Sequence, residues 1–154
     1  MTRAGPTRPK RNPPVMEQRL SVITLGVADL DRSRRFYETL GWKRGNKDAG
    51  VVFFQIPGGV FALWSRASLA EDAKLPDNGG FGGMALAYNT RSKAEVDAVL
   101  AEAKAAGARI LKIAEDTFWG GYSGYFADPD GHPWEVAWNP GWTFDENGGV
   151  RLSP

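Results

Sequence analysis

One order of secondary structure is written twice along this chain, and that internal repeat limits the folds the sequence can adopt. In the first half, β-branched residues predict a strand over 21–27, and apolar residues at helical spacing predict a helix over 32–40. Two apolar segments, 51–56 and 60–65, then flank a Pro-Gly-Gly turn and predict a β-hairpin.

The second half repeats this order. We predict a strand over 83–88, a helix over 92–106 and a strand over 108–114. A hairpin follows, in which strands over 122–127 and 133–139 are joined by an Asp-Pro-Asp-Gly turn. A strand, a helix and several strands, repeated once, are typical of an internally duplicated domain.

The repeat predicts the fold class and the register between the two halves. Neither helix joins two parallel neighbours in an evident doubly wound sheet, so the predicted class is α+β, with helices packed on one side of curved, mainly antiparallel sheets. When the halves are aligned, residues 22–29 match 83–90, and Ala62 matches Glu135.

Composition excludes several classes of protein. The chain has no cysteine and a single histidine, His132, so thiolate zinc sites, iron–sulfur clusters and multi-histidine metal sites within one chain are excluded. A net charge of +1 argues against nucleic-acid binding, and no apolar run is long enough to span a membrane. We therefore expect a cytoplasmic protein with neither nucleic acid nor membrane as a partner.

The two ends of the chain differ from its body. Residues 1–16 are rich in proline and basic residues and lack the apolar stretch of a signal peptide, so we predict a disordered tail. Residues 17–139 are predicted to form one domain. Residues 140–154 contain an Asn-Gly turn signal and are predicted to form an arm, with a short hairpin packed on the body or on a second subunit.

Two motifs resemble a known family. The segment 23–37, ITLGVADLDRSRRFY, followed by Leu-Gly-Trp at 40–42, resembles the opening of the vicinal oxygen chelate superfamily, which includes glyoxalase I, bleomycin-resistance proteins and extradiol dioxygenases. The segment 126–135, FADPDGHPWE, resembles its closing hairpin. The resemblance implies two βαβββ modules, at about 20–66 and 81–139, that curl their sheets around a cavity in a bacterial-type protein.

The resemblance also implies where a metal would bind. In metal-dependent members, one ligand comes from the first strand and one from the last strand of each module. These positions correspond to Val22, Ala62, Gly83 and Glu135, and only Glu135 has a side chain that binds metal. One carboxylate is too few ligands for a transition metal, so we predict no metal and no other cofactor.

Strand parity predicts the residues of the cavity. Glu135 is the candidate catalytic or ligand-anchoring residue, because a carboxylate in an apolar cavity binds a donor or accepts a proton. The other candidates combine small, polar and aromatic side chains that are expected to line the same space. Strand parity gives Thr24, Trp64 and Ala85, whereas Gln55 is a nearby oxygen donor, and Trp119 and Tyr122 belong to the aromatic segment before the last hairpin.

Two further features have alternative interpretations. The segment Phe118-Trp-Gly-Gly-Tyr122 is either a loop anchored by buried rings or an aromatic lid with glycine hinges. His132 follows the Asp-Pro-Asp-Gly turn, and we expect it to be an exposed turn residue rather than a catalytic one.

Two function classes follow. The first is a binding protein that holds a small, partly apolar molecule in an aromatic cavity, which the six tryptophans and the missing metal ligands favour. The second, which the resemblance implies, is an enzyme such as a glyoxalase I-like lyase or isomerase, or a dioxygenase. In either case the resemblance implies a homodimer, because modules of this superfamily commonly pair between chains, and twofold symmetry is the default arrangement.

Overall fold

The computed structural model describes residues 18, 20–82 and 84–152 of the 154-residue chain. The segment 1–16, for which we predict a disordered tail, lies outside the described residues, as does Gly83. The described part combines separate β-sheets with helices packed against them, which confirms the predicted α+β class. No helix in this part of the chain is long and apolar enough to cross a membrane.

The first half forms a three-stranded sheet, called here the first sheet, with two helices. Its elements are β1 (Val22–Val27), α1 (Leu30–Thr39), β2 (Val51–Ile56), β3 (Gly59–Ser65) and α2 (Arg66–Asp72). β3 lies between β1, to which it is parallel, and β2, to which it is antiparallel. The remaining strand of a βαβββ module is reduced to one bridge between Arg44 and Phe54. The sequence prediction misses α2, because a helix of seven residues carries too little apolar periodicity.

The second half forms a four-stranded sheet, called the second sheet, and is a complete βαβββ module. Its elements are β4 (Leu86–Thr90), α3 (Lys93–Ala105), β5 (Arg109–Asp116), β6 (Tyr122–Ala127) and β7 (Pro133–Trp138). The strand order is β4-β7-β6-β5, with only the β4–β7 pair parallel. The predicted C-terminal hairpin is present as β8 (Thr143–Phe144) and β9 (Val150–Arg151). Arg91 lies over the ring of Phe144, 4.8 Å from its centroid, and ties this hairpin to the body.

The strand pairing corrects the predicted register between the halves. Thr24 pairs with Ala62, and Ala87 pairs with Glu135. The helix caps Asp29 and Ser92 make Thr24 and Ala87 equivalent, so their partners Ala62 and Glu135 are equivalent too, as predicted. The first strands were expected to match residue 22 with residue 83, an offset of 61, whereas residues 24 and 87 are equivalent, an offset of 63. That prediction is wrong by two residues: β1 ends at Val27, two residues before the helix cap Asp29, and β4 ends at Thr90, two residues before the helix cap Ser92.

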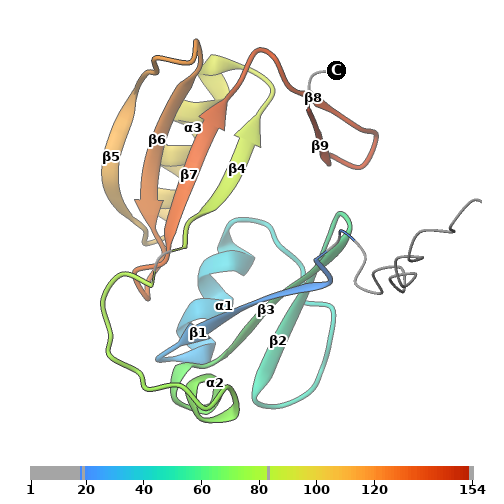
Figure 1. Ribbon diagram of the computed structural model, residues 1–154, viewed down its shortest axis with the longest axis vertical. Helices are drawn as coiled ribbons and strands as arrows, with labels where there is room; N and C mark the ends of the chain where they lie inside the picture. Colours follow the sequence, from blue (N-terminus) through green and yellow to red (C-terminus); the bar gives the residue numbers. More distant parts are fainter. Residues whose placement is uncertain (1–17, 19, 83, 153–154) are drawn as a thin grey trace, which may run out of the picture.

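One hydrophobic core joins the two halves. Alternate residues of both sheets point into it, together with the inner faces of α1 and α3. In Figure 1, α3 lies behind the strands of the second sheet. The rings of Phe61 and Trp134 are 5.8 Å apart, and those of Tyr37 and Trp134 are 6.1 Å apart, so aromatic contacts cross the junction. We call the face of each sheet that is turned away from this core its open face.

A buried carboxylate fixes the same junction. Asp128, in the turn after β6, is 3% exposed and accepts a hydrogen bond of 2.8 Å from the hydroxyl of Tyr37 on α1. Trp134 donates to the same hydroxyl at 3.1 Å. Burial first, and then the negative charge of Asp128, hold the pKa of Tyr37 well above its ordinary value. Tyr37 is therefore a permanent donor to Asp128 at neutral pH.

Candidate functional site

A row of side chains crosses the open face of the second sheet. Ala87 on β4 pairs with Glu135 on β7, which pairs with Tyr125 on β6, which pairs with Lys112 on β5. Because directly paired residues share a face, all four side chains lie on the side away from α3. Their neighbours Trp134 and Val136 are buried in the core. Glu135 itself is half-buried, as expected for a side chain on a partly covered face.

The surroundings of Tyr125 keep its hydroxyl protonated beside the Glu135 carboxylate. Burial raises the pKa of Tyr125, and the negative charge of Glu135 and a hydrogen bond to it raise that pKa further. Lys112 forms an ion pair of 2.8 Å with Glu115. The hydrogen bond to Glu115 raises the pKa of Lys112 most, followed by the charge of Glu115, and Glu135 has a smaller effect. The row therefore presents the Glu135 carboxylate beside a protonated phenol.

Sequence reasoning missed Tyr125 and Lys112. The signal for Tyr125 was present, because a two-stranded hairpin closed by Asp-Pro-Asp-Gly fixes which residues lie opposite each other. Lys112 was not predictable in the same way. The pairing of β5 with β6 shifts register between Ile110 and Lys112 and again before Glu115, and such irregularities reverse the expected face.

A hollow of about 420 Å³ lies on the open face of the first sheet. Its polar and aromatic walls are Thr24, Phe53 and Trp64, and its floor includes Ala62. Thr24, Ala62 and Phe53 form one row across the three strands. Phe53 is 36% exposed, although it is a large apolar residue. This open face is therefore a concave, mainly apolar surface.

The candidate residues divide between the two faces. Thr24 and Trp64 line the hollow of the first sheet, whereas Glu135 lies on the second sheet. Gln55 shares the face of Phe53, and its amide donates to the carbonyls of Ile56 (3.2 Å) and Gly59 (2.8 Å) at the hairpin. Since both helix-covered faces meet in one core, the two open faces do not face each other across it.

Three candidate residues remain. Ala85 is exposed and directly precedes β4. Trp119 is 40% exposed, and its ring occupies the space that a Cβ on Gly121 would need. Tyr122 faces α3, where its hydroxyl donates to Asp97 at 2.8 Å.

Two contacts explain why Tyr122 is held on the helix side. The hydrogen bond to Asp97 raises the pKa of Tyr122, so the hydroxyl remains a donor. The ammonium group of Lys93 lies 4.9 Å from the centre of its ring. The structure therefore does not bring Tyr122 to the face that carries Glu135.

The donor set at the expected metal positions does not fit a transition-metal ion. In the corrected register, Ala85 takes the place that Gly83 was given, beside Val22, Ala62 and Glu135. Only Glu135 carries a ligand atom of the usual kind in its side chain. Within residues 18, 20–82 and 84–152, no three side chains of His, Cys, Asp or Glu gather closely enough to hold a metal ion.

Comparisons with known proteins agree with this architecture. A crystal structure described as a glyoxalase-related enzyme from Fulvimarina pelagi is 40% identical, covers 90% of this chain and 100% of its own, and gives a TM-score of 0.84. A glyoxalase/bleomycin resistance protein/dioxygenase from Nocardioides is 26% identical, with 81% and 85% covered and a TM-score of 0.66. A lactoylglutathione lyase from Agrobacterium tumefaciens is 26% identical, covers 83% of this chain and 96% of its own, and gives a TM-score of 0.60.

The family assignment rests on the sequence as well. No curated protein matches the chain. The family model described as Glyoxalase/Bleomycin resistance protein/Dioxygenase superfamily matches residues 19–136, from just before β1 into β7. This segment contains both motifs that carry the resemblance, the whole first module, and the second module except for the last two residues of β7. The chain therefore belongs to the Glyoxalase/Bleomycin resistance protein/Dioxygenase superfamily.

Proposed function

We propose that this protein binds a small, partly apolar molecule as a homodimer, with the ligand held between the open face of the first sheet of one protomer and that of the second sheet of its partner. One observation carries the proposal: each chain has an apolar hollow and a carboxylate row on faces that do not meet within the chain. A second copy supplies the missing half of the site, and it covers exposed apolar residues such as Phe53 and Val22.

The two faces favour a flat ligand that carries a donor or a positive charge. Trp64 and Phe53 offer ring faces to an aromatic or apolar body. Glu135 offers a half-buried carboxylate, beside which Tyr125 stays protonated. A site with mostly apolar walls and one directional polar group orients its ligand through that group. Glu135 is therefore the ligand anchor in this proposal.

Proflavine, a flat aromatic cation with amino donors, is a suitable probe. Binding is expected to quench tryptophan fluorescence, because Trp64 lines the hollow. Glu135→Gln is expected to weaken binding about ten- to a hundred-fold, the loss of a hydrogen bond to a charged group. Glu146→Gln, a change at an exposed residue of the β8–β9 turn, is the matched control. Equal affinity in the Glu135→Gln variant would remove Glu135 from the site.

Ligand binding without a metal is part of the same proposal. Protein purified without chelator is expected to carry far less than one Zn, Ni, Fe or Mn ion per chain. The reason is that Val22 and Ala62, at two of the expected ligand positions, have side chains without a lone pair, which leaves Glu135 as the ligand. Mass-spectrometric metal analysis after dialysis against each ion tests this. Reproducible binding close to one ion per chain would contradict it.

An enzymatic function is the second candidate, and one observation favours it. The Glu135 carboxylate lies beside the protonated phenol of Tyr125, and a carboxylate held in this way can act as a general base toward a substrate. The likeness to a lactoylglutathione lyase, at 26% identity, gives the reaction to test first. Turnover in a lactoylglutathione lyase assay that Glu135→Gln abolishes would establish catalysis. Binding of proflavine without turnover supports the binding protein.

A further inference from the structure

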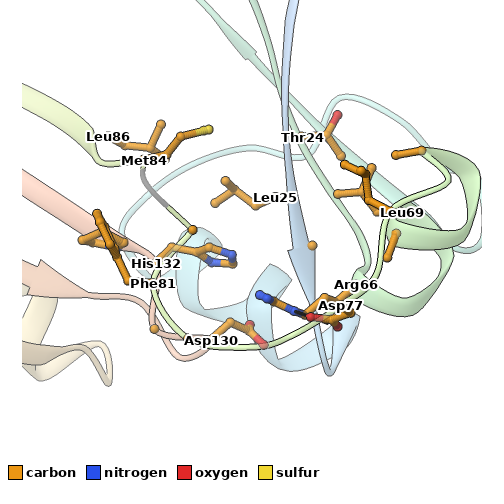
Figure 2. Close-up of a pocket in the computed structure, with 18 of the residues that line it drawn as sticks. Thr24, Leu25, Arg66, Leu69, Asp77, Phe81, Met84, Leu86, Asp130 and His132 are labelled. Atoms are coloured by element: carbon orange, nitrogen blue, oxygen red, sulfur yellow. Dashed lines mark hydrogen bonds and ion pairs between the residues drawn. The ribbon is translucent and has the colours of Figure 1, made fainter.

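A second cleft, which borders the row on the first open face at Thr24, lies where the two halves of the chain meet (Figure 2). It has a volume of about 400 Å³ and is bounded by β1, α2, residues between 73 and 82 together with Met84, and the turn between β6 and β7. Its apolar wall includes Leu69, Leu75, Phe81 and Met84. We call it the junction cleft.

His132 lines the junction cleft and is not the exposed turn residue that the sequence predicts. Its side chain is 19% exposed, and Nδ1 lies 2.9 and 3.0 Å from the two carboxylate oxygens of Asp128. Figure 2 shows the imidazole projecting into the space between Leu25 and Arg66. The turn therefore delivers a ring nitrogen to a cleft rather than to bulk solvent.

The bonds of Asp128 fix which nitrogen of His132 is free. This carboxylate accepts from the Tyr37 hydroxyl and from the backbone N–H groups of Asp130 (3.0 Å) and His132 (2.9 Å). Because a carboxylate only accepts hydrogen bonds, Nδ1 of His132 must carry a proton and donate it to Asp128. In the neutral imidazole, Nε2 then holds a lone pair, and no partner for Nε2 is seen among residues 18, 20–82 and 84–152.

Asp130 adds a second acceptor without a partner. Its Oδ1 accepts from the N–H of Ala28 at 2.7 Å and from Arg32 at 3.1 Å. Its side chain is 6% exposed, and Oδ2 has no hydrogen-bond partner within the described part of the chain. A buried carboxylate oxygen without a hydrogen-bond donor costs free energy. A hydrogen bond to it from a ligand is therefore stronger than the same hydrogen bond in water.

The charges around the cleft decide which donor fits. With His132 in its neutral form, three carboxylates, those of Asp77, Asp128 and Asp130, stand against two guanidinium groups. Arg66 donates through Nε to both oxygens of Asp77, at 2.8 and 2.9 Å, and Arg32 pairs with Asp130. One carboxylate is therefore uncompensated, which favours a cation and disfavours an anion.

We infer that the junction cleft binds a small primary ammonium compound with an apolar body. The ammonium group donates to Nε2 of His132 in the field of Asp128 and Asp130, and the apolar body lies against Leu69 and Phe81. The site is independent of the proposed open-face site, although Thr24 borders both hollows. Nothing in this assignment requires Glu135.

Three probes that share a phenyl ring and have similar size test the ligand class: benzylammonium, benzyl alcohol and benzoate. Titrations of the full chain, followed by amide chemical shifts, are expected to give a Kd of about 1 mM for benzylammonium, as is usual for a ligand of this size. Benzyl alcohol should bind more weakly and benzoate most weakly. The largest shifts are expected at residues 66–77 and 130–133. Any other order of affinity, or shifts confined to other residues, overturns the assignment.

Variants separate the roles of the two acceptors. His132→Gln is expected to weaken benzylammonium about tenfold or more. Asp130→Asn keeps an acceptor for Ala28 but removes the charge, so it should weaken benzylammonium and leave benzyl alcohol unchanged. Ala70→Phe fills the cleft from α2 without touching either acceptor and should abolish binding. Unchanged affinity in His132→Gln overturns the inference.

Two controls keep this result apart from other effects. Tyr37→Phe removes a hydrogen bond to Asp128 and lowers stability, but it leaves His132 in place, so benzylammonium should still bind. Glu135→Gln should alter proflavine binding and not benzylammonium binding. Failure of the proflavine experiment alone therefore contradicts the proposed function, and failure of the benzylammonium experiment alone contradicts the junction site.

Discussion

Replacing Asp128 by alanine is expected to lower the free energy of unfolding by about 3–5 kcal/mol. The side chain is completely buried, and it accepts hydrogen bonds from Tyr37, from His132 and from two backbone N–H groups. Its removal leaves buried donors without partners at the contact between the two halves. Urea unfolding, followed by tryptophan fluorescence, measures the change.

The matched control is Asp72→Ala, at the end of α2. Asp72 is exposed, so this change is expected to alter stability by no more than about 0.5 kcal/mol. Asp128→Asn should lie between the two, because the amide keeps an acceptor for Tyr37 but places a donor beside other donors. A loss below about 1 kcal/mol in Asp128→Ala would mean that the junction does not depend on this carboxylate.

Placing a charge on the open face of the first sheet is expected to dissociate the proposed dimer. Phe53 is 36% exposed in the single chain and is buried by the partner in our proposal. Phe53→Glu would bury an unpaired charge, which is expected to weaken dimerisation about a thousandfold. Sedimentation velocity at micromolar concentration should show a dimer for the parent chain and a monomer for the variant.

Phe118→Glu is the control for this experiment. Phe118 is fully exposed in the β5–β6 connection, outside the paired rows of both open faces, so the same substitution there should leave the dimer intact. A parent chain that is monomeric at micromolar and higher concentrations contradicts the dimer proposal. Dissociation by Phe118→Glu alone would place the interface on the β5–β6 connection instead.

Local patterns predicted most of the fold because they depend on neighbouring residues. The side chain of Asp29 accepts from the N–H of Arg32 at 3.0 Å, which starts α1 close to the predicted position. The Asp-Pro-Asp-Gly turn closes the predicted hairpin, with a positive φ at Gly131. The equivalence of Ala62 and Glu135 also followed from the repeat. The cap and the turn are each decided within a few residues of chain, and the equivalence follows because such local signals occur in the same order in both halves.

The face and the neighbours of a side chain were less predictable. Tyr122 and Tyr125 lie on one strand, but Tyr122 bonds to Asp97 on α3 while Tyr125 lies beside Glu135. An odd spacing places the two rings on opposite faces, and the face that each takes depends on where the helix packs. The alternation of residues along a strand therefore predicts which side chains share a face. It predicts which face points to the core only when the orientation of one residue is known.

The sequence by itself determined the duplicated α+β architecture, the superfamily and the candidate anchor Glu135, because strand, helix and turn signals act over short distances. Only the tertiary structure decided how these elements pack against one another and which side chains they bury. It placed the two open faces away from a single core, and it buried Asp128 between Tyr37 and His132, residues that lie on different elements. Burial and hydrogen-bond partners depend on contacts between segments about a hundred residues apart, and such contacts have no local sequence signal.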